Sequence, residues 1–114
     1  MANEKLNGTR HKYVSIDTAP GTDGEWSDPV SSVREETVKA KNIYFTRYGG
    51  GSATVTIQFK PAAFGSPWTD YLTDETLDDG ARLLLDDPGQ EIQWRAGIKN
   101  GDLSSGTVVV GFDW

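Results

Sequence analysis

The sequence predicts an all-β protein, either an antiparallel β-sandwich or a jelly-roll-like barrel of about six to eight short strands. Thirteen glycines and five prolines stand against one methionine, a balance that favours short strands joined by turns. Several segments alternate apolar and polar residues, which is the pattern of a half-buried strand. A chain of 114 residues, 36% of them hydrophobic, can bury one core. We therefore expect a single domain at residues 13–114, preceded by a flexible N-terminal arm at residues 1–12.

The first third of the chain is expected to contain that arm, one strand and a long loop. Residues 1–12 read MANEKLNGTRHK and offer a core little to bury beyond Leu6. Residues 13–19 alternate apolar and polar side chains and predict the first strand. Residues 20–32 read PGTDGEWSDPVSS, a composition typical of turns, so they predict a loop anchored by Trp26.

Two alternating runs in the middle of the chain predict a β-hairpin. Residues 32–35 have the form of a helix capping box, but the β-branched and aromatic residues that follow favour a strand at residues 39–48. Gly49-Gly50-Gly51-Ser52 then leads to a strand at residues 53–60. A phosphate-binding loop is not expected, because such a loop needs a following Lys-Ser or Lys-Thr pair and a helix. The outward side chains of the second run are Thr54, Thr56, Gln58 and Lys60.

The second half of the chain predicts further strands around an acidic stretch. Residues 61–70 form a loop that carries Trp68, and the apolar run at residues 81–85 is expected to be a buried strand. Residues 91–98 and 106–114 alternate again, which predicts a C-terminal hairpin. In the first of these strands Arg95 faces away from the apolar side.

Charge is distributed unevenly along the chain. Eight acids against one base lie in residues 70–91, whereas residues 34–60 contain five bases against two acids. Acidic oxygens in such number suit calcium, but their spacing does not match an EF-hand, so a solvated surface is the preferred interpretation. The asymmetry is also a means of orienting the chain on a partner.

Composition argues against several classes of function. The net charge of −6 disfavours a nucleic-acid partner. Without cysteine the chain has no disulfide or thiolate zinc site, and one histidine, His11, cannot form a multi-histidine metal centre. No metal or cofactor is expected. Neither a pair of carboxylates facing each other in a cleft nor an oriented imidazole is recognisable, so we expect no enzyme.

No leader or membrane-spanning run is recognisable in the sequence. The N-terminal residues lack an apolar stretch, and no run approaches the length that crosses a bilayer. We expect a soluble protein that is made in the cytoplasm without a signal peptide and has no membrane partner.

The residues from 52 to 114 resemble small proteins encoded among the structural genes of tailed bacteriophages. The resemblance rests on ATVTIQFK at residues 53–60, WTDY at 68–71, WRAGIKNGD at 94–102 and SSGTVVV at 104–110. Such proteins are β-sandwich accessory components of the virion, among them capsid decoration or cement proteins and tail-associated proteins. The shared motifs are structural and carry no catalytic signature.

This resemblance implies a decoration protein that binds the outer surface of the capsid and stabilises the shell. Its location would be the virion, its partner the major capsid protein or another virion protein, and its form a homo-oligomer, a trimer or a dimer. Two alternatives stay open: a tail or baseplate component, and a carbohydrate-binding module that uses Trp26 or Trp68. The candidate partner-binding residues are Arg10, Lys12, Trp26, Arg47, Tyr48, Trp68 and Arg95.

Overall fold

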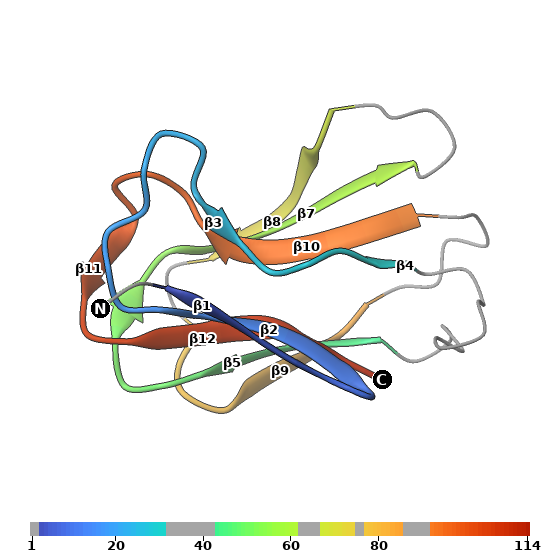
Figure 1. The fold of residues 1–114 in the computed structure, drawn as a ribbon, viewed down its shortest axis with the longest axis horizontal. Helices are drawn as coiled ribbons and strands as arrows, with labels where there is room; N and C mark the ends of the chain where they lie inside the picture. Colours follow the sequence, from blue (N-terminus) through green and yellow to red (C-terminus); the bar gives the residue numbers. More distant parts are fainter. Residues whose placement is uncertain (1–2, 32–42, 62–66, 75–76, 86–91) are drawn as a thin grey trace.

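The protein is an antiparallel β-sandwich of two packed sheets, as the sequence predicts (Figure 1). The computed structural model describes residues 3–31, 43–61, 67–74, 77–85 and 92–114. Among these residues there are twelve strands and no helix, so none that is long and apolar enough to cross a membrane. The strands outnumber the expected six to eight because several are pieces of two or three residues.

Sheet A is the lower sheet in Figure 1 and has the strand order β1-β2-β12-β5-β9. Its strands are β1 (Glu4–Gly8), β2 (His11–Ile16), β12 (Val108–Asp113), β5 (Tyr44–Tyr48) and β9 (Ala81–Leu84). Sheet B lies above it with the order β3-β10-β7-β8, and β4 also pairs with β10. Its strands are β3 (Glu25–Trp26), β4 (Val30–Ser31), β7 (Val55–Pro61), β8 (Thr69–Asp74) and β10 (Ile92–Ile98). A short pair of β6 (Ser52–Ala53) and β11 (Leu103–Ser105) lies at one end of the sandwich.

The core lies between the sheets and is built by alternate residues of their strands. On β10 the predicted inward residues are buried, while the outward Gln93 and Arg95 are partly exposed. On β12 the side chain of Phe112 packs against Phe45 of β5, with ring centroids 6.1 Å apart. The buried apolar residues are Val14, Ile16, Val30, Ile43, Phe45, Ala53, Val55, Ile57, Leu85, Ile92, Trp94, Ala96, Ile98, Val108, Val110 and Phe112.

The predicted free arm is wrong for the part of it that the structure describes. Residues 4–8 form β1, which pairs with β2 from Glu4 opposite Ser15 to Gly8 opposite His11. All five residues of β1 are exposed, so backbone hydrogen bonds hold this edge strand without apolar burial. The Lys5 ammonium also lies 2.7 Å from the Asp28 carboxylate and joins β1 to the segment between β3 and β4.

The two predicted hairpins are also wrong, although most of their strands exist. β5 pairs with β12 and β9, whereas β7 pairs with β10 and β8, so residues 49–52 carry the chain from sheet A toward sheet B. Likewise β10 and β12 belong to opposite sheets and contact each other across the core. Gly49 has a φ of 99°, a left-handed conformation that glycine adopts without strain. Residues 32–35, with their capping-box pattern, lie outside the described residues.

Two edge strands differ from their predictions. Residues 81–85 were expected to be a buried strand, but β9 is the outer strand of sheet A, and Leu84 is 55% exposed while Leu85 is buried. β8 occupies residues expected to be loop and acidic surface; it pairs with β7 at the edge of sheet B. Its side chains are mostly exposed, so the polar sequence lacks the alternation by which half-buried strands are recognised.

Candidate functional site

Three of the predicted partner-binding residues come together on the outer face of sheet B. The Arg95 guanidinium lies over the Trp26 ring at 4.3 Å and over the Trp68 ring at 4.5 Å from their centroids. The Lys60 ammonium lies 4.9 Å from the centroid of Trp68. We call these four residues the tryptophan–arginine cluster: Trp26, Arg95, Trp68 and Lys60. Each ring presents its negative face to a cation, which is the favourable geometry of a cation–π contact.

The pairing of sheet B explains why these side chains meet. Trp26 of β3 lies opposite Gly97 of β10, and Arg95, two residues away on β10, points to the same outer face. Gly97 lets β3 approach closely, because a Cβ there would lie 1.9 Å from the Glu25 carbonyl oxygen. The Trp26 indole N–H donates to the Asp23 carbonyl at 2.7 Å. The Trp26 ring is thus held by this hydrogen bond at its edge and by the Arg95 guanidinium at its face.

A chain of polar contacts fixes the Arg95 side chain from the other side. Its Nε donates to the Gln58 Oε1 at 2.9 Å, and the Gln58 Nε2 donates to the Asp70 Oδ1 at 2.9 Å. The Lys99 Nζ lies 2.5 Å from the second Asp70 oxygen. The hydrogen bond from Lys99, followed by that from Gln58, lowers the pKa of the Asp70 carboxyl below its ordinary value. Burial lowers the pKa of the Arg95 guanidinium, which still stays protonated at neutral pH.

Two hollows flank Trp26 on this face, with volumes of about 420 and 370 Å³. Gly24, Trp26 and Arg95 line both. The larger also includes Lys60 and Trp68, so all four members of the cluster surround it. The smaller extends toward Lys99 and Asn100 at the end of β10. The guanidinium of Arg95 therefore lies where a ligand in either hollow would meet it.

Arg47, expected at a partner surface, is buried instead. Its side chain is 3% exposed, and its two Nη groups donate to the carbonyl oxygens of Gly49 and Gly51. Arg47 lies on the inward face of β5 together with Phe45. Its side chain is long enough to place the guanidinium against the backbone that follows this strand. Arg47 holds the connection between the sheets and is not exposed on the surface.

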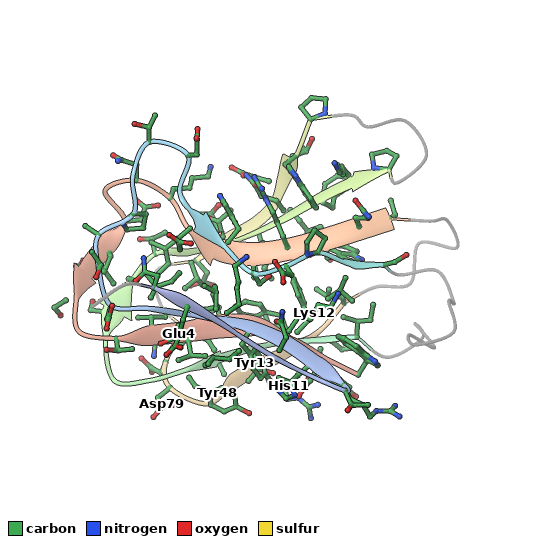
Figure 2. All side chains as sticks on the ribbon, in the orientation of Figure 1. Glu4, His11, Lys12, Tyr13, Tyr48 and Asp79 are labelled. Carbon is green, nitrogen blue, oxygen red and sulfur yellow. The ribbon has the colours of Figure 1, made fainter. Side chains whose placement is uncertain are left out.

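The other three candidates lie away from the cluster. Tyr48 is 43% exposed, and its ring meets Tyr13 edge-on at 5.9 Å, with His11 stacked on Tyr13 at 5.1 Å. Figure 2 places Tyr48, Tyr13 and His11 on the side of sheet A that faces away from sheet B. The Arg10 Nε donates to the Trp114 carbonyl, and the Lys12 Nζ donates to a carbonyl in the segment between β3 and β4. These residues mark a separate region of the surface.

Tyr13 carries the strongest electrostatic perturbation on sheet A. Burial, with the nearby Asp113 carboxylate second, raises the pKa of its phenol above the ordinary value. The phenol lies 3.3 Å from an Asp113 oxygen. The other Asp113 oxygen lies 3.2 Å from the Arg82 guanidinium, which also covers the Tyr44 ring. This network links neighbouring strands of sheet A.

The remaining sequence hypotheses concern a metal site, the acidic stretch, and Trp94 and Trp114. Within the described ranges, no three His, Asp or Glu side chains form a group that could hold a metal ion. The acidic stretch at residues 70–91 is only partly described, because its acids at positions 75, 86, 87 and 91 lie outside those ranges. Trp94 is buried as expected, and Trp114 packs against the core.

Sequence reasoning missed several residues of the site. Lys60, Gln58, Asp70 and Lys99 were not singled out as candidates, although Gln58 and Lys60 were placed on the outward face of their strand. The missing signal is the pairing of β7 with β10, which sets Gln58 opposite Arg95. Comparisons with protein-family models, curated proteins and solved structures found no match.

Proposed function

We propose that this chain is a non-enzymatic structural protein of a bacteriophage virion, a decoration protein that binds the outer surface of the capsid and stabilises the shell. The resemblance of residues 52–114 to phage accessory proteins supports this class. The observation that carries the mode of action is the tryptophan–arginine cluster, which provides a docking surface for a virion protein.

The chemistry of the cluster supports binding through that surface. Trp and Arg are the residue types most enriched where a protein interface gains its binding energy. Both are held in place by the sheet before a partner arrives, since Arg95 is stacked on two rings and bonded to Gln58. Side chains that are ordered in advance lose less conformational entropy on binding. The major capsid protein is the proposed partner, and a homo-oligomer, a trimer or a dimer, is the proposed form.

The location of the chain in particles tests the proposal. Heads and tails are separated from purified virions of the phage whose genome encodes the chain, and the copy number in each fraction is measured by quantitative mass spectrometry. Antibody labelling should find the chain on the outside of heads, and heads that lack it should open at a lower temperature. A chain present only on tails moves the assignment to a tail or baseplate component, and absence from both fractions overturns a virion role.

A carbohydrate-binding module is the second candidate, favoured by the placement of Trp26 and Trp68 on one face beside two hollows. Sugars bind tryptophan by stacking on the ring face, and here both rings already face a cation. A glycan array with the intact chain, and with Trp68→Ala as control, separates the two functions. Binding of a neutral glycan that Trp68→Ala abolishes would establish the module.

A further inference from the structure

We propose that the two hollows flanking Trp26 form one groove that binds an extended acidic segment of a partner protein, with the carboxylates held by Arg95 and Lys60. This inference rests on the proposed function, because the partner is the virion protein on which the chain docks. It adds the chemistry of the recognised segment. It also assigns Lys60 a role that the sequence did not suggest.

Charge is the first argument for an acidic ligand. The chain carries a net charge of −6, yet three cations line the larger hollow against two acids. In the smaller hollow Lys99 is paired with Asp70, so Arg95 faces the single acid Asp23. In the larger hollow the Asp28 carboxylate is bound by Lys5 and Asn7. Arg95 and Lys60, in contrast, form no ion pair within the described part of the chain. The larger hollow is therefore a locally positive part of an acidic protein, which complements an acidic partner.

The second argument is the way Arg95 is presented. Its hydrogen bond to Gln58 uses Nε, and across the described ranges neither Nη group donates to a neighbour. The contacts with both rings and the hydrogen bond through Nε hold the guanidinium in place before a ligand binds. A planar guanidinium whose Nη groups are not used by the described residues suits a carboxylate, which accepts two parallel hydrogen bonds.

The same observations disfavour other classes of partner. A glycan would stack on the indole faces, but Trp26 and Trp68 both present a face to Arg95. A nucleic acid would bring a dense array of phosphates to a protein whose net charge is negative, and the repulsion would oppose binding. Carboxylates spaced along a peptide need only the few cations that the groove supplies.

Isothermal titration calorimetry with the intact chain tests the groove. The probe is a short synthetic peptide in which Asp alternates with Ser, and its control has Asn in place of each Asp. We expect the acidic peptide to bind and the amide peptide to show no heat of binding. Arg95→Gln should weaken binding about tenfold or more, since a hydrogen bond to a charged group contributes on that order.

Two further variants keep the test decisive. Arg95 also supports both rings, so Lys60→Gln provides a variant that leaves the stack of Arg95 on Trp26 in place; it should weaken binding in the same direction. Arg82→Gln is the matched control, because it removes one exposed cation from sheet A, and binding should not change. Equal affinity for both peptides, or equal losses in Lys60→Gln and Arg82→Gln, overturns the groove.

Further outcomes of the experiment distinguish a protein segment from other anionic ligands, and the groove proposal from the proposed decoration function. Tighter binding of an oligogalacturonate or of polyphosphate than of the acidic peptide also overturns the assignment to a protein segment. If the peptide fails to bind while the chain is found on heads, the groove is wrong and the decoration function stands. If the peptide binds and the chain is absent from particles, the groove is right and the virion role is wrong.

Discussion

Gly97→Ala is predicted to displace β3 from sheet B. An added Cβ would lie 1.9 Å from the Glu25 carbonyl oxygen and 2.8 Å from the Trp26 ring. The first contact is with backbone, which cannot rotate away as a side chain can. Because Cβ contacts essentially never fall under 3.0 Å, β3 must move by about 1 Å. Such a shift disrupts the pairing of Gly97 with Trp26 and of Ile98 with Glu25.

The expected cost follows from those contacts. Overpacking of a well-packed site costs about 1–3 kcal/mol, and each backbone hydrogen bond lost adds about 1 kcal/mol. We expect the free energy of unfolding to fall by about 2–4 kcal/mol. For a chain of this length that loss lowers the melting temperature by roughly 10 °C. The same shift moves Trp26 away from Arg95, so tryptophan fluorescence of the folded protein should also change.

Urea denaturation followed by circular dichroism measures the effect. Gly50→Ala is the matched control, since no atom lies within 4 Å of its added Cβ and its φ is not positive. That control should stay within about 1 kcal/mol of the parent. A Gly97→Ala protein as stable as the Gly50→Ala protein, with unchanged fluorescence, would refute the close approach of β3 to β10.

Three further predictions address the rest of the sandwich. Arg47→Ala should lower the free energy of unfolding by about 3 kcal/mol, because it leaves a cavity and two backbone carbonyls without their donor; a urea midpoint equal to that of the parent contradicts this. The pKa of the Tyr13 phenol is raised in the folded state, so the stability that the protonated phenol contributes is complete below its ordinary pKa of 10.0 and is lost as the pH rises through the folded value. Tyr13→Phe should therefore flatten the dependence of the free energy of unfolding on alkaline pH. If the variant and the parent show the same dependence, ionisation of Tyr13 is not its cause. The hydrogen bond from Lys5 lowers the pKa of the Asp28 carboxyl below 3.8, so the stability that the ionised carboxylate contributes is present above that pH and is lost as the pH falls through the folded pKa. NMR chemical shifts of β1 should therefore show that this strand loosens in acid. Lys5→Gln should remove most of that pH dependence.

On β10 and β7, alternation predicted which side of the strand the residues of the site face. On β10 it placed Trp94 in the core and Arg95 outside, and on β7 it placed Lys60 outside. These assignments succeed because successive side chains of a strand point to opposite faces whatever the strand pairs with. Alternation therefore placed two of the four cluster residues, Arg95 and Lys60, on the outer side of their strands, although it did not show that they are neighbours.

Pairing could not be predicted in the same way. β7 has a glycine-rich segment before it, which suggested β5 as a partner, but it pairs with β10, far along the chain. Which strands become neighbours depends on how both sheets bury their inner faces together, and no short window of sequence contains that information. For the same reason Trp26, Trp68 and Arg95 were separate candidates in sequence and one cluster in space.

Polar strands escaped prediction for a different reason. β1 and β8 lie at sheet edges, where the backbone ladder holds a strand whose side chains are mostly in water. Hydrophobic patterning reports burial, so it does not detect strands of this kind. Arg47 illustrates the converse, because its charge suggested a surface role although the residue is buried beside Phe45 on β5.

The place of β12 in sheet A has a consequence for how the protein folds during synthesis. β12 comes last of the described strands, yet it lies between β2 and β5 and pairs with both. Until the ribosome releases this segment, the nascent chain has a gap in the middle of one sheet, with the edges of β2 and β5 unpaired. Such edges are open to pairing with other chains, and contacts between distant segments form slowly. The sheet therefore closes only after β12 has been synthesised, and chains emerging close together on one messenger are exposed to mispairing until β12 has left the ribosome.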